Sequence, residues 1–154
     1  MTDYNYDVRI TRVVDGDTVD VDIDLGFGVW LHKERVRIMG IDTPESRTSD
    51  DVEKVFGKAA KRRMESLLPV DSMQVLMCEQ YDSKGKFGRI LGDFKVEGDK
   101  TVTEIMIEEG HCVPYFGGSK EEIQAKHMFN RQKLLREGVV SSDDVNIAMR
   151  KSMA

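Results

Sequence analysis

Residues 18–25 begin with Thr18 and then alternate strictly between apolar and acidic side chains, and no other pattern in the chain limits its possible folds as strongly. Successive side chains of a β-strand point to opposite faces, so this period of two predicts a strand with one buried face and one solvated face. The side chains predicted to point inward are Val19, Val21, Ile23 and Leu25. Gly26-Phe27-Gly28 follows, and glycines at this spacing suit a tight turn into a strand over residues 29–39. We therefore expect a sheet containing a β-hairpin.

The other elements follow from apolar spacing and from residues that begin or end helices. Apolar side chains over residues 51–68 recur at helical spacing, which predicts a long helix. Asp50 and Glu53 suit a capping box at its start, and Pro69 ends it. Further helices are predicted over residues 101–109 and 119–137, and further strands over residues 7–14, 72–80 and 88–96.

The order of these elements predicts the fold class. Strands followed by a helix, two more strands and two helices favour an α+β fold over a parallel α/β sheet. Five strands with three α-helices allow a small OB-type β-barrel, a frame that often binds nucleic acid. We expect one domain over residues 1–140 and a loosely ordered C-terminal tail over residues 141–154, where no periodicity is evident.

Composition argues against several classes of protein. No run approaches the roughly 20 apolar residues that a membrane span requires. The start, Met1-Thr2-Asp3-Tyr4-Asn5, lacks the features of a signal peptide, so we expect a cytoplasmic protein without a membrane or an obligate protein partner. Three histidines and two cysteines without metal-ligand spacing argue against zinc and against a disulfide.

The charges are unevenly distributed along the chain. A net charge of −5 is unusual for a nucleic-acid binder. The acidic row over residues 20–24 resembles part of a calcium-binding loop, but Leu25 and Leu31 stand where such a loop needs Gly and Glu. We therefore assign this row to a solvated strand face. A basic run is likewise interpreted as a solvated helix face, and its members are Lys54, Lys58, Lys61, Arg62 and Arg63.

Three short segments combine residue types that bind ions. They are Asp15-Gly16-Asp17-Thr18, Arg37-Ile38-Met39-Gly40-Ile41-Asp42-Thr43-Pro44-Glu45 and Lys84-Gly85-Lys86-Phe87-Gly88-Arg89. Period-two alternation places Arg37 on the face of Ile41, unless Gly40 forms a bulge. An arginine among apolar side chains requires an anion, because burying an unpaired charge is costly.

The end of the middle segment carries oxygen donors. Pro44 restricts Thr43 to extended conformations and so directs the Thr43 carbonyl, close to the carboxylate of Asp42. Carbonyl and carboxylate oxygens are the ligands that calcium takes. Each segment is also compatible with a structural role, in which Arg37 pairs with Asp42 or Glu45 and residues 15–18 form only a turn.

Together, the three segments resemble the motifs of the staphylococcal nuclease family, and the resemblance extends from about Val8 to Gly138. The matching motifs are Val-Asp-Gly-Asp-Thr, Val-Arg-Ile-Met-Gly-Ile-Asp-Thr-Pro-Glu and Lys-Phe-Gly-Arg. Proteins of this family have an OB barrel with three helices. The resemblance implies that Asp17 and Asp42 bind calcium through their carboxylates and Thr43 through its main-chain carbonyl.

The same resemblance implies roles in catalysis and substrate binding. Glu45 matches the general base, or the group that positions the attacking water. Arg37 and Arg89 match the two arginines that grip the scissile phosphate. Lys86 and Tyr115 lie where the family contacts the terminal phosphate and the base of the substrate.

The implied activity is that of a calcium-dependent nuclease, which hydrolyses DNA or RNA with low sequence specificity and leaves 3′-phosphates. Phe87 stands where the family often has tyrosine, so a hydroxyl contact is lost there. Two alternatives stay open: a non-catalytic OB-fold module that binds nucleic acid, and an inhibitor-like protein whose acidic strand mimics nucleic acid. A non-catalytic copy usually loses some metal, base and arginine positions, whereas this chain keeps all six.

Overall fold

The computed structural model describes residues 4–78, 90–96, 98–115 and 118–153 of the chain. Its centre is a closed barrel in which neighbouring strands follow the order β1-β2-β3-β6-β5. These strands are β1 (Tyr4–Asp15), β2 (Thr18–Gly26), β3 (Val29–Ile38), β5 (Met73–Cys78) and β6 (Ile90–Lys95). All neighbours pair antiparallel except β3 and β6, which are parallel. The predicted α+β fold with a five-stranded OB-type barrel is confirmed.

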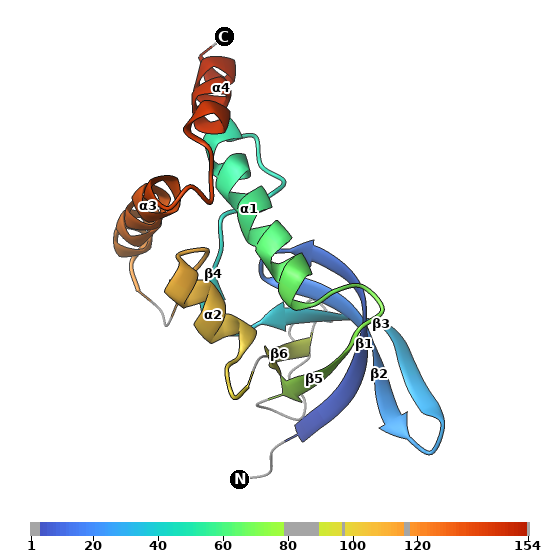
Figure 1. Cartoon of the computed structure of the whole chain (residues 1–154). Helices are drawn as coiled ribbons and strands as arrows, with labels where there is room; N and C mark the ends of the chain where they lie inside the picture. Colours follow the sequence, from blue (N-terminus) through green and yellow to red (C-terminus); the bar gives the residue numbers. More distant parts are fainter. Residues whose placement is uncertain (1–3, 79–89, 97, 116–117, 154) are drawn as a thin grey trace.

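The alternating strand behaves as predicted inside the barrel and departs from the prediction at its end. Val19, Val21 and Ile23 are buried, whereas Leu25 is 43% exposed. The difference arises because the β2–β3 hairpin projects beyond the body of the barrel (Figure 1). Its turn has positive φ at Gly26, Phe27 and Gly28, as the glycine spacing suggested.

The described residues form four helices: α1 (Asp51–Leu67), α2 (Val102–Glu109), α3 (Lys120–Arg136) and α4 (Ser142–Ser152). The C-terminal half of α1 lies against the barrel, and its N-terminal half extends away towards α4 (Figure 1). Met64 and Leu67 accordingly join the barrel core, while Phe56 and Ala59 form a second core with Leu134 of α3. Helix α1 therefore connects two hydrophobic cores.

The C-terminal stretch corrects an expectation. Residues 141–154 were expected to be loosely ordered, but most of them form α4, whose first turn is capped by the Ser141 side chain. Val145 packs against the second core, and Ala148 is buried against α1. Two small apolar side chains in so short a segment give too weak a helical periodicity to be recognised in the sequence. The expected number of helices, three, is therefore one too few.

Two short strands complete the fold. β4 (Ile41–Asp42) pairs antiparallel with β7 (Val113–Pro114), outside the barrel. This pairing connects the segment that follows β3 to the segment between α2 and α3. None of the described helices is long and apolar enough to cross a membrane.

Candidate active site

The turn from β1 to β2 places Asp17 where the barrel meets α1. A Cβ at Gly16 would lie 2.9 Å from the Cβ of Ala60 on α1 and 3.5 Å from Cγ2 of Thr43. Only a residue without a side chain allows the turn to approach α1 so closely. The carboxylate of Asp17 is 19% exposed and accepts a hydrogen bond of 2.9 Å from the Thr18 hydroxyl.

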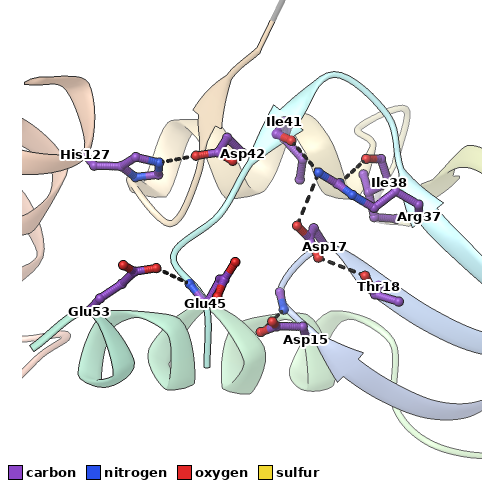
Figure 2. Close-up of polar contacts among 11 residues, drawn as sticks. Asp15, Asp17, Thr18, Arg37, Ile38, Ile41, Asp42, Glu45, Glu53 and His127 are labelled. Carbon is purple, nitrogen blue, oxygen red and sulfur yellow. Dashed lines mark hydrogen bonds and ion pairs between the residues drawn. The ribbon is translucent and has the colours of Figure 1, made fainter. Parts of the chain in front are cut away.

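Arg37 lies on β3, between β2 and β6, and its guanidinium folds back over its own chain. Nη1 donates to the carbonyl of Ile38 at 2.6 Å, and Nη2 donates to the carbonyl of Ile41 at 3.0 Å. Nη2 also forms an ion pair with Oδ2 of Asp17 at 3.3 Å (Figure 2). A guanidinium has five N–H donors, so these contacts do not exhaust its capacity to bind a further anion.

The backbone after Arg37 settles which face this residue occupies. β3 ends at Ile38, and Gly40 adopts a φ of 73° in the turn that follows. Ile41 is 1% exposed, whereas the Arg37 side chain is 24% exposed. The turn at Gly40 interrupts the alternation that would place Arg37 on the face of Ile41, which is the exception that the sequence left open. The observed ion pair joins Arg37 to Asp17, not to Asp42 or Glu45 as the structural alternative supposed.

Asp42 is held by a residue from the far end of the chain. It lies on β4, and its Oδ2 is 2.6 Å from Nε2 of His127 on α3 (Figure 2). A carboxylate can only accept, so the imidazole donates this hydrogen bond. The His127 side chain is 11% exposed and that of Asp42 is 44% exposed. Sequence reasoning missed His127, because a single histidine on a polar helix gives no signal that points to a partner 85 residues away.

The segment that carries Glu45 rests directly on α1. A Cβ at Gly57 would lie 2.2 Å from the carbonyl oxygen of Glu45 and 2.6 Å from the nitrogen of Ser46, so the helix needs glycine there. Oε2 of Glu53 accepts a hydrogen bond of 2.9 Å from the backbone N–H of Glu45. The predicted capping box is thus only half formed: Asp50 caps α1, but Glu53 turns to the neighbouring loop. The Glu45 side chain itself is exposed.

A pocket of about 160 Å³ opens between this loop, α1 and α3. It is lined by Asp42, Thr43, Pro44, Glu45, Glu53, Gln124, His127 and Arg131. The predicted residues Asp42, Thr43 and Glu45 are therefore brought together, with a wall from α3 that the sequence analysis did not identify. Within that wall, the guanidinium of Arg131 stacks on the ring of Phe56 at 5.1 Å.

Both predicted calcium carboxylates act electrostatically on one buried thiol. Burial, and then the negative charges of Asp17 and Asp42, raise the pKa of Cys112 to about 12. The two carboxylates therefore concentrate negative charge in one part of the structure, which a cation would offset. No group of three or more His, Cys, Asp or Glu residues within the described ranges is placed to hold a metal. The donors that the sequence predicts are two carboxylates and the Thr43 carbonyl, and such hard oxygen donors fit calcium.

The remaining predicted residues lie at the margin of the site or outside the described residues. The backbone N–H of Tyr115 donates to the carbonyl of Gly40 at 2.8 Å, and the Tyr115 side chain is 48% exposed. Lys86, Phe87 and Arg89 lie outside the described residues. Their predicted roles therefore stay predictions.

Comparison with known proteins identifies the family. The family described as "Staphylococcal nuclease homologue" matches residues 35–140. The chain belongs to the staphylococcal nuclease family. The matched range of this family includes seven of the eight predicted site residues, all except Asp17, and it ends before α4.

Relatives of this chain are named as endonucleases and as a thermonuclease. The chain is 33% identical over 104 residues to the SPbeta prophage-derived endonuclease YokF and 33% identical over 103 residues to the endonuclease YncB, both from Bacillus subtilis. It is 32% identical over 101 residues to the thermonuclease of Staphylococcus intermedius. The matched regions cover 68%, 67% and 66% of this chain, but only 32%, 45% and 55% of the relatives. The chain thus matches about a third to about half of each relative.

Proposed function

We propose that the protein is a calcium-dependent nuclease that hydrolyses phosphodiester bonds of DNA or RNA with low sequence specificity and leaves 3′-phosphate ends. The observation that carries this proposal is the position of Arg37, which contacts both Asp17 and the carbonyl that directly precedes Asp42. One guanidinium thereby connects the two segments that hold the predicted metal ligands. Membership of the family, and relatives named endonuclease and thermonuclease, support nuclease activity.

The arginines supply the charge that phosphodiester hydrolysis requires. An anionic nucleophile must approach an anionic phosphate, and planar guanidinium groups bind two phosphate oxygens at once. Arg37 keeps donors for this purpose, and Arg89 is proposed as the second arginine. Arginines on a transferring phosphoryl group supply about 10³–10⁵-fold in rate.

The acidic residues divide into metal ligands and a base. Asp17, Asp42 and the Thr43 carbonyl would hold calcium, which polarises the phosphate and orients water when it is bound. Glu45 is exposed beside the pocket and is proposed to take the proton of the attacking water, a step worth about 10²–10⁴-fold. Lys86 is proposed to bind the terminal phosphate of the substrate.

A cleavage assay tests the proposal. Purified protein is incubated with labelled single- and double-stranded DNA and RNA, in calcium, in magnesium and in chelator. We expect cleavage with calcium alone, because magnesium requires a tighter octahedron and gives up water reluctantly. The products should become extendable by a polymerase only after phosphatase treatment, which would identify 3′-phosphate ends.

The rival function is a non-catalytic OB module that binds nucleic acid. This function predicts binding to the same oligonucleotides without cleavage in any of the three conditions. Equal turnover with magnesium and with calcium would support nuclease activity but contradict the assignment of calcium as the cation.

A further inference from the structure

A second polar surface lies between α1 and α4 and is separate from the pocket that Glu45 lines. It is a groove of about 300 Å³. Its cationic lining residues are Lys54, Lys58, Arg62 and Lys151, and its carboxylates are Asp51 and Asp144. Apolar side chains, including Val55 and Ile147, complete the lining. Four cations therefore face two carboxylates in a chain whose net charge is −5.

The side chains of the four cations have no partners among the described residues. Within that part of the chain, none of these side chains forms a hydrogen bond or an ion pair. Lys54, Lys58 and Arg62 follow one another at intervals of four residues, a spacing at which like charges destabilise a helix. The two carboxylates lie in the first turns of α1 and α4, where they complement the helix dipoles. The groove is thus an unneutralised cationic stripe.

The fold of α4 argues against a purely solvated helix face. A solvated stripe needs only α1, yet α4 packs on α1 and places Lys151 across the groove from Lys58 and Arg62. Residues of both helices contribute to one cationic lining. The family match ends at residue 140, so this second wall lies outside the matched range.

The stripe begins next to the candidate active site. Lys54 directly follows Glu53, whose carboxylate holds the backbone N–H of Glu45. Each residue turns an α-helix by roughly 100° about its axis. Relative to Gly57, the rotation about the α1 axis is roughly 60° for Lys54, and it is roughly 100° for Lys58 and roughly 140° for Arg62 in the same direction. A strand that leaves the site near Glu45 would therefore meet Lys54 first and then pass along the groove.

We propose that the groove between α1 and α4 is a binding site for the phosphate backbone of a nucleic-acid strand, beyond the segment in the active site. This inference rests on the proposed function, since it assigns a further contact to the same substrate. The cations bind successive phosphates, and the apolar lining packs against the aliphatic stems of the lysines and against the sugars. Backbone contacts of this kind give affinity without sequence specificity.

The test measures binding without turnover. Fluorescence anisotropy records the affinity for a single-stranded DNA of about 20 nucleotides in chelator, over a range of salt concentrations. The triple variant Lys58→Gln/Arg62→Gln/Lys151→Gln should bind at least about tenfold more weakly at low salt. Its slope of log K against log salt should fall by about 2, since each lost contact with a single strand contributes about 0.7. Thermal melting checks that the variant is folded.

A matched pair of variants separates the groove from general charge. Lys151 lines the groove, whereas its neighbour Arg150 is exposed in the same turn of α4 and does not line it. Lys151→Glu should weaken binding several-fold, and Arg150→Glu should change it less than about twofold in 0.15 M salt, where charges more than about 8 Å apart are largely screened. Equal losses in the two variants, or an unchanged salt slope in the triple variant, would overturn the proposal.

A competitor separates nucleic acid from another polyanion. Poly-glutamate at the same charge concentration should compete poorly, and equally tight binding would overturn the assignment to nucleic acid. Because the assay contains no metal, a protein that fails to cleave with calcium can still show the groove-dependent affinity. Failure of the proposed function and failure of this inference are therefore distinguishable.

Discussion

The two halves of the candidate site are built in different ways. Asp17 and Arg37 belong to the barrel, whereas Asp42, Thr43 and Glu45 belong to a loop with only the two-residue strand β4 at its start. In the barrel half, the strand ladder sets the positions: Thr18 lies opposite Arg37, and the Ile38 N–H donates to the Asp17 carbonyl at 2.8 Å. Hydrogen bonds between neighbouring strands make this half rigid.

The loop half depends on contacts with the helices α1 and α3. Glu53 and Gly57 of α1 hold the backbone at Glu45, and His127 of α3 holds Asp42. Each of these three residues makes a separate contact with the loop, so a single substitution can test each contact. We therefore expect the proposed metal and base positions to tolerate changes in the helices less well than their surface location suggests.

The largest effect is expected from Asp42→Ala in the loop half. It removes a proposed metal ligand, so calcium-dependent cleavage should fall by about 10³-fold or more, since metal polarisation is worth several kcal/mol. The fold should stand, with a stability loss below about 1 kcal/mol, because this partly exposed contact to His127 is largely screened by solvent. Calorimetry with calcium and thermal melting measure the two quantities. Unchanged calcium affinity would show that Asp42 is a structural residue.

Arg37→Lys tests the barrel half. Lysine cannot reach both carbonyls and Asp17 while it also spans two phosphate oxygens, so kcat should fall by about 10²–10³-fold. The substitution should lower kcat if the contacts of Arg37 strengthen in the transition state. It should raise KM if Arg37 only binds the substrate. A smaller loss is expected for Arg89→Lys. Near-normal kcat and KM in both variants would mean that neither arginine binds the reacting phosphate.

Gly57→Ala tests the support of the loop by α1. The added methyl group would meet the Glu45 backbone at 2.2 Å, so the loop must shift. A shift near 1 Å costs about 10–100-fold in rate, even though alanine is the better helix former. Gly118→Ala is the control, because its Cβ would meet only the flexible end of Glu122 at 3.4 Å. Similar rates for the two variants would refute the role of Gly57.

The smallest effect is expected from Glu53→Ala, which removes one hydrogen bond to the Glu45 N–H. Such a bond contributes about 0.5–1.5 kcal/mol, so the rate should fall by about threefold to tenfold. Glu65→Ala on the same helix is the matched control, because Glu65 is exposed. If Glu65→Ala lowers kcat as much as Glu53→Ala, the loss comes from helix charge and not from the loop contact.

The sequence predicts the barrel half of the molecule better than the loop half. The strands, the hairpin turn and the long helix α1 follow from local patterns, and residues such as Val19, Val21 and Met64 are buried as their spacing indicates. The face of Arg37 stayed open, since alternation alone cannot show whether Gly40 continues the strand or forms the left-handed turn that the structure has. The short helix α4 was missed, because its few apolar side chains gain meaning only against α1.

The supports of the loop half could not be read from local pattern. The spacing of Glu53 from Asp50 matches a capping box. This spacing does not show that Glu53 instead accepts a hydrogen bond from the backbone N–H of Glu45. The contact of His127 with Asp42 spans 85 residues and depends on how α3 docks. The candidate site residues were predicted from motifs, whereas the residues that hold them in place required the three-dimensional structure.

The central claim is that the barrel half and the loop half form one site around one cation, and a double-mutant cycle tests it most directly. The variants Asp17→Asn, Asp42→Asn and the double variant are compared in single-turnover cleavage at fixed calcium. Because both carboxylates would bind the same ion, the double variant should be no slower than the worse single variant, within about threefold. Independent residues instead give losses that multiply. A double variant whose loss equals the product of the two single losses would contradict a shared site.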